Sequence, residues 1–488
     1  MPLEPHAAYL VLKARDARFD GRLFVGVTST GIYCRPICRV RLPKAENCRF
    51  FTHAAGAEHG GFRPCLRCRP ELAPGLSLMD SSQSLAHHAA RMLEHAARAG
   101  GEVALPQVAQ RLGVTDRHLR RIFLECHGVA PIDYLTTQRL LLAKQLLTDT
   151  VLPVTQVALA SGFGSVRRFN AAFAERYRMN PSALRRERPG TVSADGTVSS
   201  PVALRLSYRP PYDVAGVLRF FEQRCIPGVE AVDGAVFRRT LGLVPAGQDP
   251  GQVVPGWISA RFVPERHEVH VSVAPQLAPL LGTVLERLRQ GLDLDADPSR
   301  IDPALHDLPG APGTRMPGTL DGFEVAVRII LGQQVTVAAA RTLVRRLVER
   351  FGLPVETPFA DLNRLFPSPQ ALALASDDAI GQLGIVRQRI GAIKALALAV
   401  IDGRIELSRG APLQATLDAL LALPGIGAWT VQLVAMRALA WPDAFPASDI
   451  GVLNALGSRD IKLAEQRAEA WRPWRAYAVM RLWQTLEN

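Results

Sequence analysis

Two pairs of cysteines near the N-terminus constrain the fold of this 488-residue chain more than any other feature. Cys34 and Cys38 stand close together, and Cys65 and Cys68 follow after a stretch that is long enough to fold back. This is the spacing of a tetrahedral, all-cysteine zinc site. We therefore predict one zinc ion per chain, and a purely structural role for that site is the alternative to a reactive one.

Basic residues are concentrated in the first part of the chain. Residues 1–190 hold 27 Lys and Arg against 15 Asp and Glu, whereas residues 191–488 hold 30 of each. The whole formal net charge of +12 therefore lies in the first part. This asymmetry favours nucleic acid as a partner over a merely soluble basic surface. Arginines also crowd the cysteines, as a site facing a phosphate backbone requires. They are Arg35, Arg39, Arg41, Arg63, Arg67 and Arg69.

Two stretches rich in Pro, Gly and Ser divide the chain, at residues 71–84 and 188–200. The second coincides with the change in charge. We therefore expect a multidomain protein with α+β and mainly α parts. The expected parts are a small four-cysteine zinc domain (1–76), a helical DNA-binding domain (80–188), a linker (189–200), an α/β subdomain (201–300) and a helical domain (301–488).

The composition also argues against several classes of protein. Seven cysteines, four of them in the metal site, do not make a disulfide scaffold. Residues 1–14 lack the basic start and the long apolar core of a signal peptide. The most apolar stretch, residues 417–441, is broken by Pro424 and Gly425 and carries Arg437, which argues against a membrane span. We expect a cytoplasmic protein, associated with the nucleoid, that has no membrane partner.

Two similar helical units lie between the two breaks. Residues 105–123 and 154–177 each show helical spacing of apolar residues around a central glycine, Gly113 and Gly162, where two helices must turn sharply. Each unit predicts a helix-turn-helix whose second helix enters a major groove, and residues 132–147 predict a linking helix. A plain helical bundle with solvated arginines is the alternative. The candidate DNA contacts are Arg117, Arg120, Arg121, Arg167, Arg168 and Asn170.

The second half of the chain carries a different signal. Residues 253–262 and 268–273 have β-like patterns, and the chain after Arg315 is rich in helical patterns. Residues 423–427 read Leu-Pro-Gly-Ile-Gly, a tight turn between helices whose free backbone N–H groups can hold a phosphate. Asp449 follows about twenty residues later. An Asp at such a position is often only a helix N-cap, so the pairing of hairpin and Asp is the informative feature.

The first 188 residues resemble two known families. Residues 160–185 are similar to the signature of AraC-type transcription factors, although Met179 stands where that family often has Gly. Residues 28–34 (Thr-Ser-Thr-Gly-Ile-Tyr-Cys) and 61–70 resemble the N-terminal domain of the Ada adaptive-response regulator. The resemblance implies that the zinc-bound thiolate of Cys34 takes a methyl group from a DNA methylphosphotriester, with Cys38, Cys65 and Cys68 completing the zinc site. It also implies a stoichiometric reaction that strengthens promoter binding.

The remainder, from about residue 201, resembles the AlkA-type 3-methyladenine DNA glycosylases of the helix-hairpin-helix superfamily. The matching motifs lie at residues 209–213, 328–336, 423–430 and 471–478. The resemblance implies that Asp449 is catalytic and that Gly425 and Gly427 contact DNA. Members that also cut the strand carry a Lys after the hairpin, which residues 428–431 lack, so a monofunctional glycosylase is expected.

The resemblance also suggests how an alkylated base is held. The candidate walls of the base pocket are Phe220, Trp429 and Trp483, whose aromatic faces suit a cationic methylated purine, and each of them could equally fill the core. Gln334 stands where the best-known member has an apolar wedge, and Leu433 replaces an aromatic residue. Gln334 is therefore the candidate for the wedge that fills the duplex, and the identity of that residue is left open.

These features predict an alkylation-damage response protein with two activities. One is excision of 3-methyladenine and related bases, and the other is activation of transcription in response to methylphosphotriesters. The alternative is a transcription regulator whose glycosylase-like half only binds DNA. The expected partner is double-stranded DNA carrying alkylated bases, methylphosphotriesters or promoter sequences, with RNA polymerase a further candidate, and we expect a monomer. No Pro-Cys-His-Arg site for methylguanine transfer occurs, so that activity should be absent.

Overall fold

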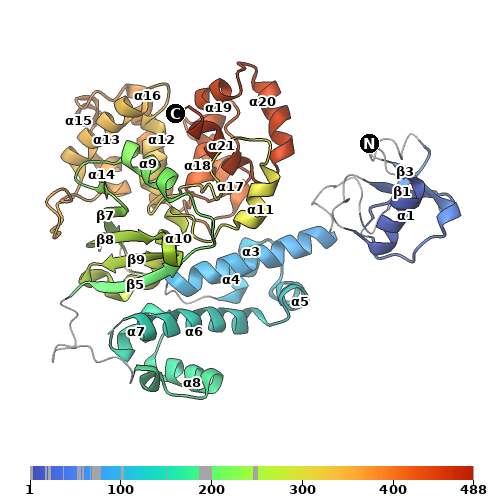
Figure 1. Cartoon of the computed structure of the whole chain (residues 1–488), viewed down its shortest axis with the longest axis horizontal. Coiled ribbons are helices and arrows are strands. Elements are labelled where there is room, and N and C mark those ends of the chain that lie inside the picture. Colours follow the sequence, from blue (N-terminus) through green and yellow to red (C-terminus); the bar gives the residue numbers. More distant parts are fainter. Residues whose placement is uncertain are drawn as a thin grey trace. The chain divides into compact units, whose positions relative to one another are not determined.

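The computed structural model describes residues 4–16, 19, 23–36, 38–51, 57, 60–65, 68, 78–99, 104–150, 152–185, 200–245 and 251–486. The chain divides into two compact units, Met1–Met92 with Ala104–Tyr134, and Leu93–Val103 with Leu135–Asn488 (Figure 1). No helix among the described residues is both long and apolar enough to cross a membrane. The predicted multidomain class with α+β and mainly α parts is confirmed.

A small sheet positions the cysteines in the first unit. The unit begins with helix α1 (Pro5–Ala14) and a four-stranded sheet of order β3-β1-β2-β4. The strands are β1 (Phe24–Val27), β2 (Ile32–Cys34), β3 (Cys48–Phe51) and β4 (Arg63–Pro64), with a short 3₁₀ helix, η2, at Ala45–Asn47. Strands β2 and β4 are parallel, with Tyr33 opposite Pro64. The next residues, Cys34 and Cys65, therefore come to the same end of the sheet.

The first helix-turn-helix follows the long helix α3 (Leu78–Ala99). It consists of α4 (Leu105–Arg111) and α5 (Asp116–His127), joined by a turn in which Gly113 has φ +68°. Only glycine adopts this conformation readily, which explains the residue at the sharp turn. Thr115 caps α5 by accepting a hydrogen bond from the His118 amide at 3.2 Å. Leu119, Ile122 and Phe123 are buried, so the predicted apolar face of this unit is confirmed.

The second helix-turn-helix repeats the same construction. The predicted linking helix is α6 (Pro131–Asp149), which precedes α7 (Val154–Ala160), α8 (Val166–Tyr177) and the 3₁₀ helix η4 (Pro181–Arg185). Gly162 has φ +78° at the turn, and Ser165 accepts a hydrogen bond from the Arg168 amide at 3.2 Å. Phe163, Phe169 and Phe173 pack their rings in sequence, with centroids 5.2 and 5.5 Å apart.

The α/β part of the second unit is built on a five-stranded antiparallel sheet of order β5-β9-β8-β7-β6. The strands are β5 (Val202–Ser207), β6 (Glu230–Asp233), β7 (Val236–Leu243), β8 (Val254–Val263) and β9 (Glu268–Val273). The two predicted β runs are β8 and β9, whereas the other three strands were not predicted. Residues of β5 alternate between buried and exposed, so one face of the sheet lies on the core and the other carries polar side chains.

Helices follow and surround the sheet. Near the sheet lie α9 (Val214–Arg224), the 3₁₀ helices η5 (Pro264–Arg266) and η6 (Pro275–Leu280), α10 (Leu281–Gly291) and α11 (Pro298–Ala304). The helical part contains α12 (Gly322–Leu331), α13 (Val337–Phe351), α14 (Pro369–Leu374), α15 (Asp377–Gly381), α16 (Arg387–Ile401), α17 (Leu413–Leu421), α18 (Ala428–Arg437), α19 (Ile450–Ala455), α20 (Ile461–Ala468), η7 (Glu469–Trp471) and α21 (Arg475–Gln484).

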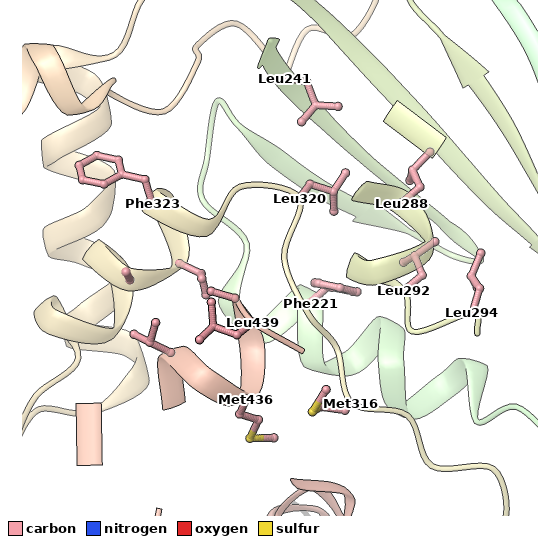
Figure 2. Close-up of a cluster of buried hydrophobic side chains, with 14 of the residues drawn as sticks. Phe221, Leu241, Leu288, Leu292, Leu294, Met316, Leu320, Phe323, Met436 and Leu439 are labelled. Atoms are coloured by element: carbon pink, nitrogen blue, oxygen red, sulfur yellow. The ribbon is translucent and has the colours of Figure 1, made fainter. Parts of the chain in front are cut away.

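One hydrophobic core joins the sheet to these helices. Figure 2 shows Phe221 of α9, Leu241 of β7 and Leu288 of α10 in one hydrophobic cluster with Phe323 of α12 and Met436 of α18. All five side chains are buried. The core therefore fixes α9, α12 and α18, the helices that carry the pocket described below, against one another.

A buried ion network reinforces the same junction. Arg239 of β7 donates to Glu230 at 3.0 Å and to Glu324 of α12 at 2.6 Å, and Arg328 bonds the same two carboxylates at 2.9 and 3.0 Å. Burial alone would raise the pKa of Glu324, but Arg239 and Arg328 outweigh burial and lower that pKa. The contribution of Glu324 to stability is therefore complete above its unfolded pKa and is lost as the pH falls through its lowered folded pKa.

We expect Arg239→Ala to destabilise the second unit by about 3–5 kcal/mol, because it leaves two buried carboxylates with one cation between them. All six tryptophans lie beyond residue 250, so their fluorescence during denaturant unfolding reports on this half of the chain. Arg238→Ala is the matched control. The adjacent Arg238 pairs with Asp233, whose side chain is 74% exposed, and its guanidinium lies 5.1 Å from the centroid of the Phe359 ring. Its loss should therefore cost about 1–2 kcal/mol, less than the loss of Arg239. Equal losses for the two variants would show that the network adds no stability.

Candidate active site and metal centre

The predicted hairpin lies between α17 and α18 in the second unit. Gly425 has φ +74°, and a Cβ there would approach Ala392 Cβ to 3.2 Å, so glycine is required at this position. Gly427 is the N-cap of α18, and nothing lies within 4 Å of a Cβ placed on it. Both glycines are exposed. Their backbone amides, at the positive end of the α18 dipole, are therefore accessible to a phosphate.

Asp449 is held at the N-terminus of α19 with both carboxylate oxygens engaged. Oδ1 accepts hydrogen bonds from the Val452 amide at 3.0 Å and from Trp483 Nε1 at 2.9 Å. Oδ2 accepts one from Trp429 Nε1 at 2.9 Å. Gly451 leaves room for this arrangement, since a Cβ on it would lie 3.0 Å from Asp449 Oδ1 and from the Trp483 ring. Asp449 is therefore an N-cap, as the alternative interpretation holds, and is also fixed by two indoles from other helices.

A cavity of about 1270 Å³ brings the candidate residues of the second half together. Its lining includes the carboxylate and its two indole donors, the two hairpin glycines and several side chains of α9, α12, α13 and α18. The predicted residues among them are Asp449, Trp429, Trp483, Phe220, Gln334, Leu433, Gly425 and Gly427. The cavity has the size of a ligand-binding pocket, and it can hold one base together with its sugar.

Phe220 lies in this cavity with two arginines over its ring. The guanidinium carbons of Arg224 and Arg437 are 4.0 and 4.9 Å from the ring centroid. Burial, followed by repulsion from Arg328 and Arg224, lowers the pKa of Arg437 to about 9. The electron-rich ring of Phe220 is therefore already engaged with the protein's own cations. Trp429 and Trp483 are half-buried, and their rings line the cavity beside the carboxylate.

The loop between α12 and α13 forms one rim of the cavity. Gln333 Nε2 donates to the Gly425 carbonyl and to Thr430 Oγ1, both at 3.0 Å, and Arg389 donates to the Gln333 carbonyl. The loop is thereby fastened to the hairpin. Gln334 is exposed with φ +54°, a strained conformation for a residue with a side chain, and Val335 next to it is 37% exposed. Gln334 as the wedge stays a prediction.

The four cysteines of the first unit form a single cluster. Their sulfurs all lie within 4.8 Å of one another, and all four residues are buried. Hydrogen bonding to Cys38 and Cys68, followed by burial, raises the pKa of the Cys34 thiol, which a divalent cation among the sulfurs would lower. Four cysteine sulfurs at tetrahedral spacing are the donor set that zinc prefers, so the residues fit this metal.

The arginines around this cluster are not equivalent. Arg35 is fully buried, and its backbone N–H points to Cys68 Sγ at 3.5 Å, so the expectation that its side chain faces phosphate is wrong. Arg39, Arg41 and Arg63 are exposed, as that expectation requires. Arg67 and Arg69 lie outside the described residues.

The predicted groove-facing residues are all exposed on the second helices of their units. In α5, Arg120 pairs with Asp116 at 2.8 Å and Arg121 with Glu125 at 2.9 Å, whereas Arg117 forms no ion pair among the described residues. In α8, Arg167, Arg168 and Asn170 are exposed. Exposed pairs of this kind are weak, so DNA phosphates can compete for these arginines.

Sequence reasoning missed several residues of the second-half cavity, namely Gln333, Arg224, Arg389 and Arg437. Arg224 follows Phe220 by one helical turn, so its position over the ring could have been inferred from helical spacing. Gln333 lies within the matched motif at residues 328–336, next to Gln334, so the resemblance offered a signal for it. Arg389 and Arg437 reach the cavity through tertiary packing, which carries no local sequence signal.

Four family models match the chain in succession. They are the metal binding domain of Ada over residues 7–71, a helix-turn-helix domain over 108–187, the AlkA N-terminal domain over 203–321 and the HhH-GPD superfamily base excision DNA repair protein over 327–472. Together with the cysteine cluster, the first match establishes one zinc ion per chain. Fold and site thus define a helix-hairpin-helix repair protein joined to an Ada-type zinc module and a DNA-binding module.

Known relatives match either nearly the whole chain or a little over half of it. A protein of Mycobacterium tuberculosis described as a probable bifunctional transcriptional activator/DNA repair enzyme AlkA is 38% identical over 98% of this chain and 96% of its own length. The Escherichia coli DNA-3-methyladenine glycosylase 2 is 32% identical over 57% of this chain and 96% of its own length. The solved 3-methyladenine DNA glycosylase of Archaeoglobus fulgidus is 21% identical, covers 57% of this chain and 96% of its own, and has a TM-score of 0.48. The chain belongs to the family of AlkA-type bifunctional transcriptional activator/DNA repair enzymes.

Proposed function

We propose that the second half of this chain is a monofunctional DNA glycosylase that excises 3-methyladenine and related alkylated bases. The observation that carries this proposal is the Asp449 carboxylate, held by the indoles of Trp429 and Trp483 at the edge of a cavity large enough for a base with its sugar. The adjoining hairpin offers backbone amides to the DNA strand. A protein that only bound DNA could use Asp449 as an N-cap of α19, but it would not need two indole donors that orient the carboxylate at the cavity.

The hydrogen bonds suggest how the carboxylate acts. Once the damaged nucleotide is flipped into the cavity, departure of its base leaves positive charge on the sugar, which the Asp449 carboxylate stabilises. Oδ1 accepts two hydrogen bonds among the described residues, and Oδ2 accepts one. The remaining acceptor position on Oδ2 can take a hydrogen bond from water. This bond orients the water toward the sugar carbon and allows its proton to pass to the carboxylate as the new C–O bond forms.

We propose a second activity for the first unit, transfer of a methyl group from a DNA methylphosphotriester to Cys34. A zinc ion held by Cys34, Cys38, Cys65 and Cys68 would keep the thiolates deprotonated and nucleophilic. The Cys34 sulfur forms a bond to the methyl carbon, and the methyl–oxygen bond breaks. The phosphate recovers its negative charge, which exposed Arg39, Arg41 and Arg63 favour. Because the thioether is stable, each chain reacts once.

Methylation of Cys34 would also regulate the binding of promoter DNA. Methylation removes the negative charge of one thiolate, which lowers repulsion between the zinc module and DNA. The two helix-turn-helix units would then hold promoter DNA more tightly through Arg117, Arg167 and Arg168, with RNA polymerase as the partner of the activated, monomeric chain. The competing function, a regulator whose second half only binds DNA, predicts the same promoter binding without base release.

Base release therefore separates the two functions. We expect purified protein to release 3-methyladenine from methylated duplex DNA and to leave an intact abasic site, because residues 428–431 lack the Lys of the strand-cutting enzymes. Chromatography of the released bases and denaturing electrophoresis of the DNA before and after alkali would follow both steps. Failure to release any methylated purine would favour the regulator, and strand cleavage without alkali would contradict the monofunctional assignment.

A further inference from the structure

The outer, polar face of the five-stranded sheet carries a row of basic side chains away from the cavity described above. Arg205 of β5 lies directly opposite His270 of β9, and His270 lies directly opposite Arg261 of β8. Opposite residues in a sheet point to the same face, and neighbouring strands lie about 4.8 Å apart. Both arginines are exposed, and their Cα atoms are therefore separated by roughly 10 Å with the imidazole between them.

The acidic side chains near this row are engaged with groups other than its two arginines. Glu268 pairs with His270 at 3.0 Å, and Asp233 pairs with Arg238 of the next row at 2.6 Å. Neither Arg205 nor Arg261 has an ion pair within the part of the chain that the structure describes. Both arginine side chains are therefore available to an anion that lies over the row.

A hollow of about 680 Å³ lies over the row. Besides the three basic residues, its polar lining consists of the Ser259 and Ser272 hydroxyls and the Asp149 carboxylate, which accepts a hydrogen bond from Thr148 at 3.4 Å. Two guanidinium groups with hydroxyls beside them are typical of sites that bind phosphate. No Phe, Tyr or Trp is among the described residues of this lining, so the hollow offers no platform on which a base could stack.

The row follows the second helix-turn-helix unit closely in the chain, which favours DNA as the source of the phosphate. Strand β5 begins at Val202, and the second helix-turn-helix unit ends with η4 at Arg185. The intervening residues can span at most about 60 Å, whatever conformation they take. At about 3.4 Å for each base pair, this distance corresponds to roughly 17 base pairs of duplex DNA. A duplex that is bound by α8 and extends this far can therefore also contact the row.

We propose that Arg205, Arg261 and His270 form an auxiliary binding site for the phosphate backbone of duplex DNA, separate from the glycosylase cavity and from both helix-turn-helix units. The site is independent of sequence and of damage. It adds affinity and salt dependence to the binding of any long duplex, and it leaves base excision at a saturating DNA concentration unchanged.

The test compares full-length, zinc-loaded variants on a labelled, lesion-free duplex by fluorescence anisotropy across a salt series. Arg205→Ala/Arg261→Ala should weaken binding about three- to thirty-fold at low salt and make the slope of log affinity against log salt shallower by about 1–2. The control is Arg266→Ala/Arg404→Ala, which removes the same charge from exposed positions outside the row and should change the slope by less. Arg205→Lys/Arg261→Lys should retain most of the binding.

Two results would overturn the site. One is an equal slope for the Arg205→Ala/Arg261→Ala protein and the control protein. The other combines two observations: inorganic phosphate shifts the NMR signals of the His270 side chain, and the variants leave the affinity for DNA unchanged. This result would assign the hollow to a free anion. Retained base release by the double variant on saturating methylated DNA shows that the protein is folded, so a failed proposal here would leave the glycosylase assignment intact.

Discussion

Asp449→Asn should reduce release of 3-methyladenine by at least about 10²–10³-fold while leaving affinity for damaged DNA nearly unchanged. The substitution keeps the shape of the side chain and its capacity to cap α19, because Asn is as good an N-cap as Asp. It removes the charge that opposes the cationic sugar. It also turns an amide group toward one of the two indole N–H donors, so one hydrogen bond seen in the structure is lost.

Two further variants separate chemistry from binding. Asp418→Asn removes an exposed carboxylate of α17 that accepts a hydrogen bond from Gln414 at 2.8 Å, and this variant should excise at the wild-type rate. In Gly427→Asp the new side chain fits in the free protein without a clash, but its carboxylate lies where we expect the DNA phosphate to bind. The variant should therefore weaken DNA binding. Single-turnover excision at saturating protein and a separate binding assay distinguish the two effects. Wild-type excision by Asp449→Asn would end the catalytic role of this carboxylate.

Exposure to DNA containing methylphosphotriesters should place one methyl group per chain on Cys34 and on no other cysteine. Cys34 ends strand β2 and belongs to the sulfur cluster, and the exposed arginines Arg39, Arg41 and Arg63 lie near the four cysteines in sequence. The measurement is mass spectrometry of proteolytic peptides before and after exposure. A methyl group on Cys38, or unmethylated protein after prolonged exposure, would contradict the assignment.

Zinc content provides the control for this reaction. Cys65→Ser should lose the metal and with it the methyl-acceptor activity, since a serine hydroxyl does not replace a thiolate ligand. Cys48→Ser is the matched substitution. Cys48 lies outside the cluster, and its sulfur donates to the Lys44 carbonyl at 3.3 Å, so zinc and activity should be retained. Unchanged zinc in Cys65→Ser would remove Cys65 from the ligand set.

Local patterns in the sequence were sufficient for the modules that depend on local structure. The helix-turn-helix units could be predicted because Gly113 and Gly162 mark turns with positive φ and each unit repeats the same apolar spacing. The cysteine cluster could be predicted because two close pairs of cysteines at this spacing are typical of a zinc site. The placement of Asp449 beside Trp429 and Trp483 followed only from the family resemblance, since the indoles come from α18 and α21.

Features that depend on tertiary packing could not be predicted from the sequence. Arg35 looks like one more surface arginine, but its position next to Cys34 places it inside the small module. The network of Glu230, Arg239, Glu324 and Arg328 combines residues from three elements, and its charges carry no sign of burial in the sequence. Strands β5 to β7 were missed because two of them, β6 and β7, bury polar residues of this network and do not show simple alternation. The assigned roles of the site residues and the domain boundaries stay predictions.

The central claim, two independent chemistries in one chain, is tested most directly on a single DNA sample that carries both methylated purines and methylphosphotriesters. Wild-type protein, Asp449→Asn and Cys34→Ser are each incubated with this DNA, and released bases and methylated cysteine peptides are quantified from the same tube. The account predicts both products with wild type, only the methylated Cys34 peptide with Asp449→Asn, and only free methylated bases with Cys34→Ser. Wild-type protein that releases no base, or an Asp449→Asn protein that releases bases normally, would contradict it.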